Sequence, residues 1–317
     1  MPHSPRLRRG CRMSACVWGE RDLAKVYCTT HRQWAFDADE TCGKARMSAQ
    51  QAVYDVIRGA IANHPRSLQK RIGPSEIGAT CDRRIGYKLL GQEENPRGDA
   101  WKPTVGTAVH AWLEKALEDA NLAQVIAAGG QIEDHELDWI TEQSVTVGYL
   151  ADGTAITGSC DAYHRPTATV IDHKIVGVAS LRDKKANGPG QQYRAQVHMY
   201  GAGFLMAGHK VEHVAINFLP QNGNLTDGWW WTEPFDMSIA AQAITRLRAI
   251  EAHVATSGSV EGLPAADAWC AFCPFHLPGS SDLSAGCPGV TASRASGGFA
   301  HMVEAPTITT PNRKKAS

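Results

Sequence analysis

The chain of 317 residues carries 32 basic and 32 acidic side chains, and this balance neither indicates nor excludes a nucleic-acid partner. An apolar fraction of 43% suffices for a packed core, whereas no apolar run reaches the roughly 18 residues that would predict a membrane span. Because the arginines near the start have no apolar segment after them, no secretory signal is predicted, and we expect a cytoplasmic location where the nine cysteines favour metal binding over disulfides.

The predicted elements are, in chain order, three helices, three strands, a helix, two strands and a last helix. Residues 1–46 contain four cysteines and little apolar periodicity, so they predict a separate N-terminal extension. Apolar spacing and β-branched runs predict helices over 48–63, 75–90, 104–121, 189–207 and 238–256, and strands over 143–150, 154–163, 167–175, 211–219 and Trp229–Trp231. Residues 47–290 therefore predict an α/β domain with a mixed central sheet flanked by helices. Residues 291–317 are rich in small polar residues and predict a disordered tail.

Two aspartates fall on neighbouring strands of this predicted sheet. Pro166 lies in the turn between the strands, so Asp161 and Asp172 are expected on adjacent antiparallel strands, with Lys174 on the same face as Asp172. Converging carboxylates suit Mg²⁺ or Mn²⁺, which acidifies a bound water and stabilises charge on a phosphodiester. A lysine beside the ion can orient that water or neutralise developing charge, and the backbone carbonyl of His173 is a further candidate ligand. An exposed Asp/Lys pair without any catalytic role would show the same pattern.

Motifs on both sides of this strand pair make the pattern specific. Upstream, a Gly-Thr-Ala-Val-His helix segment ends at His110, and Glu114 lies one turn later on the same face. Downstream, Gln196 and Tyr200 stand four residues apart on another predicted helix. In this order the motifs over residues 106–200 resemble the RecB-type nucleases of the PD-(D/E)XK superfamily. The signature of that group is a Gly-Thr-x-x-His helix, a Gly-x-x-Asp strand, an Asp/Glu-x-Lys strand and a Gln-x-x-x-Tyr helix.

The resemblance implies a metal-dependent DNA exonuclease that acts on single-stranded or end-exposed DNA. The metal ligands that it implies are His110, Asp161, Asp172 and the backbone of His173. The catalytic residues that it implies are Asp161, Asp172, Lys174, Gln196 and Tyr200. Gln196 and Tyr200 would position the DNA or brace Lys174, although a plain core position is an equal alternative for Tyr200.

Cysteines enclose these motifs. Cys81 precedes them, Cys270, Cys273 and Cys287 follow them, and four thiolates can hold either one tetrahedral metal ion or a [4Fe–4S] cluster. The arrangement resembles the iron–sulfur RecB-like exonucleases, which include the CRISPR-associated single-strand exonucleases, the AddB nuclease domain and related phage proteins. The resemblance implies a [4Fe–4S] cluster whose binding is coupled to folding. The alternative is a zinc site formed by the three late cysteines and a residue such as His276, with Cys81 as an ordinary buried thiol.

A separate set of ligands lies in the N-terminal extension. The spacing of Cys11, Cys16, Cys28 and His31 is typical of a zinc site, and Cys42 is a spare candidate. A module of about 35 residues has too little core to fold without such a staple. The segment resembles the small zinc knuckle at the ends of many actinobacteriophage proteins. The alternative is an extension whose cysteines have no role.

Three functions remain open at this point. The first is a phage-encoded exonuclease of DNA replication or recombination, located in the host cytoplasm. The second is a CRISPR adaptation nuclease that trims spacer precursors together with partner proteins. The third is a non-catalytic DNA-binding or assembly subunit, which the intact signature disfavours. The sequence gives no indication of the oligomeric state, although the resembling family includes toroidal homo-oligomers.

Overall fold

The computed structural model describes residues 26–28, 33–35, 49–64, 71–95, 101–266 and 270–290. The chain separates into two compact units, of which the first comprises Met1–Gln69 with Gly98–Thr104, and the second comprises Lys70–Arg97 with Val105–Ser317. The boundary that we expect near residue 46 and the predicted tail over 291–317 stay predictions.

The described residues of the first unit form two short strands, one complete helix and the first residues of a second helix that continues into the other unit. Strands β1 (Val26–Cys28) and β2 (Gln33–Ala35) pair antiparallel, and helix α1 spans Ala49–Ala62, which confirms the helix predicted over 48–63. Of the predicted zinc ligands, Cys11, Cys16 and His31 lie outside the described residues, and only the backbone of Cys28 is described, so the predicted zinc site stays a prediction.

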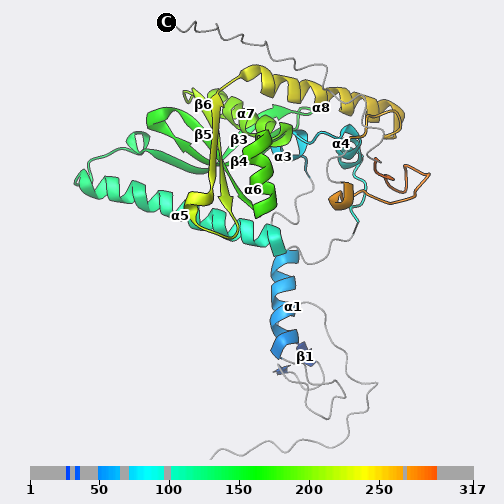
Figure 1. Cartoon of the computed structure of the whole chain (residues 1–317), viewed down its shortest axis with the longest axis horizontal. Coiled ribbons are helices and arrows are strands. Elements are labelled where there is room, and N and C mark those ends of the chain that lie inside the picture. Colours follow the sequence, from blue (N-terminus) through cyan, green and yellow to red (C-terminus); the bar gives the residue numbers. More distant parts are fainter. Residues whose placement is uncertain are drawn as a thin grey trace, which may run out of the picture. The chain divides into compact units, whose positions relative to one another are not determined.

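The second unit is built on a five-stranded mixed sheet (Figure 1). The strands, in the order in which they lie side by side, are β3 (Trp139–Tyr149), β4 (Ala155–His164), β5 (Thr169–Val176), β6 (His213–Pro220) and β7 (Trp229–Pro234). Strands β5 and β6 run parallel, and every other neighbouring pair is antiparallel. The prediction of an α/β fold with a mixed central sheet, including the antiparallel order of its first three strands, is confirmed.

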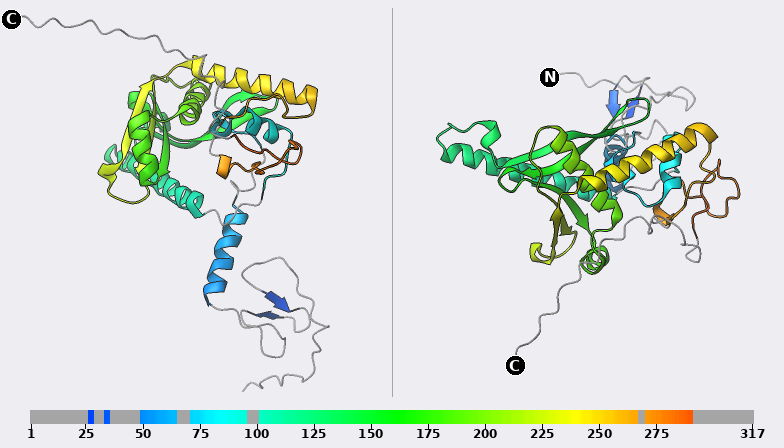
Figure 2. Two further views of the ribbon diagram at one scale, coloured as in Figure 1. Left: turned by 45° about the vertical axis from the view of Figure 1, so that its right-hand side comes forward. Right: turned by 90° about the horizontal axis from the view of Figure 1, so that it is seen from above.

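Helices cover both faces of this sheet. Helix α7 (Gln191–Met206) packs on one face, where its apolar residues join the main core with those of β3 to β6. Helix α5 (Trp101–Ala127) supplies Leu117 to a smaller cluster on the other face, around Ile171. Figures 1 and 2 show α5 along one side of the sheet and α8 (Met237–Ser257) along the opposite side. Among the described residues, no helix is both long and apolar enough to cross a membrane.

The structure differs from the predicted elements at two places that matter for the sites. The helix predicted over 75–90 is two helices, α3 (Pro74–Ile77) and α4 (Asp82–Leu89). Gly78 follows α3 at a point where a side-chain Cβ would lie only 2.4 Å from the carbonyl oxygen of Gln192, so helix α7 packs against bare backbone there. The extended backbone at Cys81 then starts α4.

The second difference is helix α6 (Val178–Asn187), which lies between β5 and α7 in the chain and which the sequence did not predict. Its only buried residue is Leu181, so it has no apolar periodicity to detect. Helix α5 also extends beyond the predicted range of 104–121.

A buried arginine ties α8 to the segment between α3 and α4. The Nε of Arg246 donates to the Asp82 carboxylate at 2.6 Å, and its Nη1 donates to the backbone carbonyls of Ala79 at 2.7 Å and of Ile77 at 3.3 Å. Arg246 is 8% exposed, so these bonds replace almost all of its hydration. The clamp fixes the backbone on both sides of Cys81.

We predict that Arg246→Ala lowers the free energy of unfolding by about 3–5 kcal/mol, because it leaves the Asp82 carboxylate and two backbone carbonyls without their donor. Urea denaturation followed by circular dichroism measures this loss. The matched control is Arg248→Ala, two residues along α8, whose partly exposed pair with Glu251 should contribute less than about 1 kcal/mol. Equal losses for the two variants would contradict the clamp.

Candidate active site

The two predicted aspartates face one another where β4 and β5 stop pairing. The ladder ends at the pair Ala162 and Ile171, and the next residue of each strand beyond this end is Asp161 on β4 and Asp172 on β5. In place of a ladder bond, the backbone N–H of His173 donates to the Asp161 carboxylate at 2.6 Å. The short helical turn at Arg165–Thr167 joins the strands, as Pro166 predicts. The hairpin therefore brings the two carboxylates together in an almost fully buried position.

Asp172 is held from two sides on the face that α7 covers. The Nζ of Lys174 lies 2.6 Å from one carboxylate oxygen of Asp172. The side-chain amide of Gln196 donates to the other oxygen at 3.2 Å, and it also contacts the Tyr200 hydroxyl at 3.2 Å. Gln196 and Tyr200 thus support Asp172 from the core side, with only 4% and 6% of their surfaces exposed.

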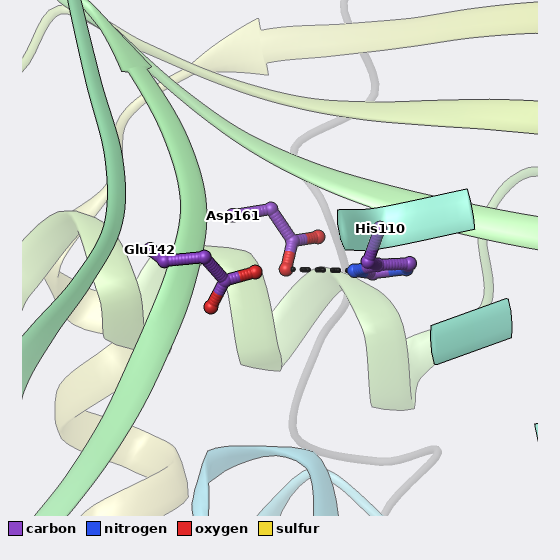
Figure 3. A group of neighbouring side chains, drawn as sticks. All are labelled: His110, Glu142 and Asp161. Atoms are coloured by element: carbon purple, nitrogen blue, oxygen red, sulfur yellow. Dashed lines mark hydrogen bonds and ion pairs between the residues drawn. The ribbon is translucent and has the colours of Figure 1, made fainter. Parts of the chain in front are cut away.

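Asp161 makes its contact with the opposite helix. The Nδ1 of His110 on α5 lies 3.1 Å from one carboxylate oxygen of Asp161 (Figure 3). Glu142 on β3 completes this group, because one ligand atom of each of His110, Glu142 and Asp161 lies within 4.8 Å of the other two. The three side chains come from α5, β3 and β4 and point toward one another in Figure 3.

The pKa values of the two aspartates are shifted in opposite directions. Burial raises the pKa of Asp172 to about 6, and the negative charge of Asp161 adds to this, although Lys174 opposes it. For Asp161 burial acts in the same direction, but the hydrogen bond and charge of His110, together with the charge of Lys174, outweigh it and hold the pKa of Asp161 below its usual value. The pair therefore contains one firmly ionised carboxylate and one that binds a proton more readily.

The basic partners of the two aspartates, His110 and Lys174, both have raised pKa values. Burial would lower the pKa of Lys174, but the charges of Asp172 and Asp161 outweigh it and raise that pKa. Burial alone would also lower the pKa of His110, but the hydrogen bond to Asp161 and the charge of Asp161 outweigh burial, so the pKa of His110 is raised. Lys174 also lies over the ring of Tyr193, at 5.2 Å from the centroid.

The side chain of His173 lies on the α5 side of the sheet, as strand alternation predicts. Its ring stands edge-on to that of His110, with 6.2 Å between the centroids, and its Nδ1 contacts Asn217 at 3.2 Å. Its role as a backbone metal ligand stays a prediction. Glu142 is the member of the site that the sequence analysis missed, because nothing in its local sequence separates it from an ordinary strand residue.

The four predicted cluster cysteines line one cavity in the second unit. Cys81 directly precedes α4, Cys270 begins a short helical turn (Cys270–Phe272) that Cys273 follows, and Cys287 lies further along the same loop. The empty space within this cavity is about 360 Å³, a volume that includes open solvent at its mouth. Residues 270–290 lie beside α4 (Figure 2).

The walls of this cysteine cavity carry positive charge and an aromatic pair. The Nη1 of Arg83 lies 3.8 Å from the sulfur of Cys287, and Arg84 is another lining residue. Burial raises the pKa of the Cys273 thiol, and the charge of Arg84 opposes this effect. Tyr87 stacks on a loop phenylalanine and donates its hydroxyl to the carbonyl of Leu283 at 2.6 Å. Two guanidinium groups next to four thiols are suited to an anionic occupant.

Comparison with known proteins gives similar structures at low identity. No protein-family model matches the chain, and no curated protein matches it. Among solved structures, the chain is similar to the protein SSO0001, with 17% identity and a TM-score of 0.42 over 72% of this chain and 94% of that one.

Two further solved structures carry an activity in their names. A putative exonuclease from Eubacterium rectale shows 15% identity and a TM-score of 0.40 over 76% of this chain and 97% of that one. An alkaline exonuclease from Laribacter hongkongensis shows 13% identity and a TM-score of 0.36 over 64% of this chain and 93% of that one.

Proposed function

We propose that this protein is a Mg²⁺- or Mn²⁺-dependent DNA exonuclease. The observation that carries the proposal is the meeting of Asp161 and Asp172 at the point where β4 and β5 separate, with Lys174 at 2.6 Å from Asp172 and His110 at 3.1 Å from Asp161. Buried carboxylates that face one another repel, and a divalent cation relieves that repulsion.

The donor set fits a divalent cation of the hard or borderline class. Carboxylate oxygens of Asp161 and Asp172 and a nitrogen of His110 would hold it, and the backbone carbonyl of His173 is the further ligand that the sequence indicates. When bound, such an ion acidifies a water molecule and stabilises negative charge on a phosphodiester.

The protein residues around the ion have separable tasks. Lys174 stays protonated, and its positive charge would stabilise the negative charge of the pentacoordinate transition state through which hydrolysis of the phosphodiester passes. Gln196 holds the Asp172 carboxylate in place through its 3.2 Å hydrogen bond, and Tyr200 holds Gln196. These two residues are positioning residues, because both are buried behind the carboxylates.

Digestion of matched linear and circular single strands tests the activity. With Mg²⁺ or Mn²⁺ present, the purified protein should release nucleotides from a labelled linear strand and leave a covalently closed circle of the same sequence intact. Cleavage of the circle would identify an endonuclease instead. No cleavage of either substrate in either metal would refute the proposal.

The raised pKa of Asp172 predicts how cation binding depends on pH. Below about pH 6 the Asp172 carboxyl is increasingly protonated and the proton competes with the cation, so the affinity for Mn²⁺ should fall by up to about tenfold per pH unit. Above that pH the Asp172 proton no longer competes, and the affinity should rise further as His110, whose pKa is raised by Asp161, loses its own proton. Calorimetric titration of the protein with Mn²⁺ between about pH 5 and 8 measures the profile. In Asp172→Asn the step near pH 6 should disappear, and an unchanged step would assign it to another group.

We further propose that Cys81, Cys270, Cys273 and Cys287 hold a [4Fe–4S] cluster. All four line one cavity. The neighbouring Arg83 guanidinium would attract the negative charge of a cluster bound to four thiolates. A tetrahedral zinc ion holds its sulfur ligands about 3.8 Å apart. Among the described residues, only His110, Glu142 and Asp161 bring three ligand atoms within 4.8 Å of one another, so the wider spacing of the thiols supports a cluster of several irons over one ion.

A further inference from the structure

Glu142 occupies an unusual backbone position directly across from Asp161. On either side of it, Thr141 pairs with Ala162 and Gln143 pairs with Cys160, so Glu142 faces Asp161 on the neighbouring strand. Its φ of 43° lies in the left-handed region, which side chains other than glycine rarely occupy. A strand residue in this conformation is turned away from the regular alternation of β3, and strain of this kind accompanies functional positions.

The carboxylate that this backbone directs toward Asp161 is only half satisfied by protein. One oxygen, Oε2, accepts a hydrogen bond from the Ser159 hydroxyl at 2.5 Å. Across the described parts of the chain, the other oxygen has no hydrogen-bond donor. Glu142 thus presents an available oxygen next to Asp161 and His110, the arrangement that Figure 3 shows.

The surroundings of this group are negatively charged and contain an unmatched polar atom. Burial, and then the charge of Glu142, raises the pKa of Glu114, which lies one turn beyond His110 on α5. His173 is 7% exposed and stands edge-on to His110, and its buried Nε2 has no hydrogen-bond partner among the described residues. Three carboxylates beside one histidine, with a buried nitrogen that a metal-bound water could satisfy, indicate a hydrated cation.

We propose that Glu142 is a direct ligand of the cation that His110 and Asp161 bind, and that this set of one imidazole and two carboxylates selects Mn²⁺ over Mg²⁺. Imidazole is a ligand of first-row transition metals, whereas Mg²⁺ prefers oxygen ligands and water. The inference rests on the proposed function, because His110 and Asp161 belong to both sets of ligands. It adds a third strand, β3, to the cation site and assigns the metal.

The test is a calorimetric titration of the purified full-length protein with Mn²⁺ and, separately, with Mg²⁺, and electron paramagnetic resonance of the unbound Mn²⁺ serves as a second readout. Glu142→Gln keeps the shape of the side chain and should weaken Mn²⁺ binding at least about tenfold. His110→Gln should reduce the ratio of Mn²⁺ to Mg²⁺ affinity. Glu118→Gln, which removes the same charge from the exposed surface of α5, should change the Mn²⁺ affinity less than about twofold.

The outcomes separate this inference from the proposed function. If Asp161→Asn abolishes Mn²⁺ binding while Glu142→Gln binds it like the wild type, Glu142 is not a ligand and the inference is overturned, but the proposed cation site stands. If Asp161→Asn also binds Mn²⁺ like the wild type, the proposed cation site itself fails. Wild-type protein that binds Mg²⁺ as tightly as Mn²⁺ contradicts the selectivity. Circular dichroism of each variant establishes that it is folded.

Discussion

Asp172→Asn should reduce the release of nucleotides from linear DNA by at least about a thousandfold, equivalent to ~4 kcal/mol of transition-state stabilisation. The amide keeps the size of the side chain and can still accept the hydrogen bond from Gln196. It removes the negative charge that faces Asp161 and that Lys174 contacts at 2.6 Å. The variant therefore loses a proposed ligand of the cation and the negative charge that Lys174, the proposed catalytic lysine, contacts.

The measurement is the initial rate of digestion of an end-labelled strand in Mn²⁺ and in Mg²⁺. Asp183→Asn on helix α6 is the matched control, because Asp183 is exposed and, within the described part of the chain, contacts only neighbouring residues of its own helix. The control should keep its rate within about twofold. A folded Asp172→Asn protein that digests DNA at the wild-type rate would exclude Asp172 from catalysis.

Cys81→Ser should yield a colourless protein that unfolds at a much lower temperature. The proposed cluster would join Cys81 to Cys287, some two hundred residues away in the chain, and closing a loop of that length would contribute on the order of 5 kcal/mol to stability. The wild type, purified without oxygen, should show a broad absorbance near about 400 nm, which is typical of iron–sulfur proteins.

Iron content, the absorbance and the thermal midpoint are the three measurements for this variant. Cys160→Ala is the matched control, because Cys160 is fully buried beside Asp161 and does not line the cysteine cavity. It should keep its iron and absorbance, and lose about 1 kcal/mol from the missing sulfur. A wild-type preparation that is active, colourless and free of iron would contradict the cluster.

The strand pair that carries Asp161 and Asp172 could be predicted because its signals are local. Both strands lie in segments rich in Val, Ile, Thr and Tyr, and Pro166 sets the turn between them. Position along the strand then places Lys174 on the same face as Asp172. The same holds for Gln196 and Tyr200, because a spacing of four residues on a helix places both side chains on one face.

Other parts of the two sites depend on contacts that local sequence does not encode. The break between α3 and α4 lies next to Gly78, whose backbone closely approaches Gln192, over one hundred residues away in the chain. Glu142 joins the site through the register of β3 against β4 and through its own left-handed backbone. Neither feature alters the apolar pattern, which is the signal that sequence reasoning uses.

The cysteine cavity could be predicted from the sequence only in part. The late group Cys270, Cys273 and Cys287 is compact in the sequence, whereas the predicted partner Cys81 depends on a resemblance. The structure places all four in one cavity, because the Arg246 clamp holds the backbone around Cys81 and the stacking of Tyr87 on Phe275 holds the late loop against α4.

Metal-dependent digestion of DNA by the wild-type protein is the most direct test of the proposed function. A labelled linear single strand is incubated with the protein in EDTA, and Mn²⁺ is then added in excess. The proposed cation site at Asp161 and Asp172 predicts no release of nucleotides before the addition and rapid release after it. Release of nucleotides in EDTA, or none after Mn²⁺, would contradict it.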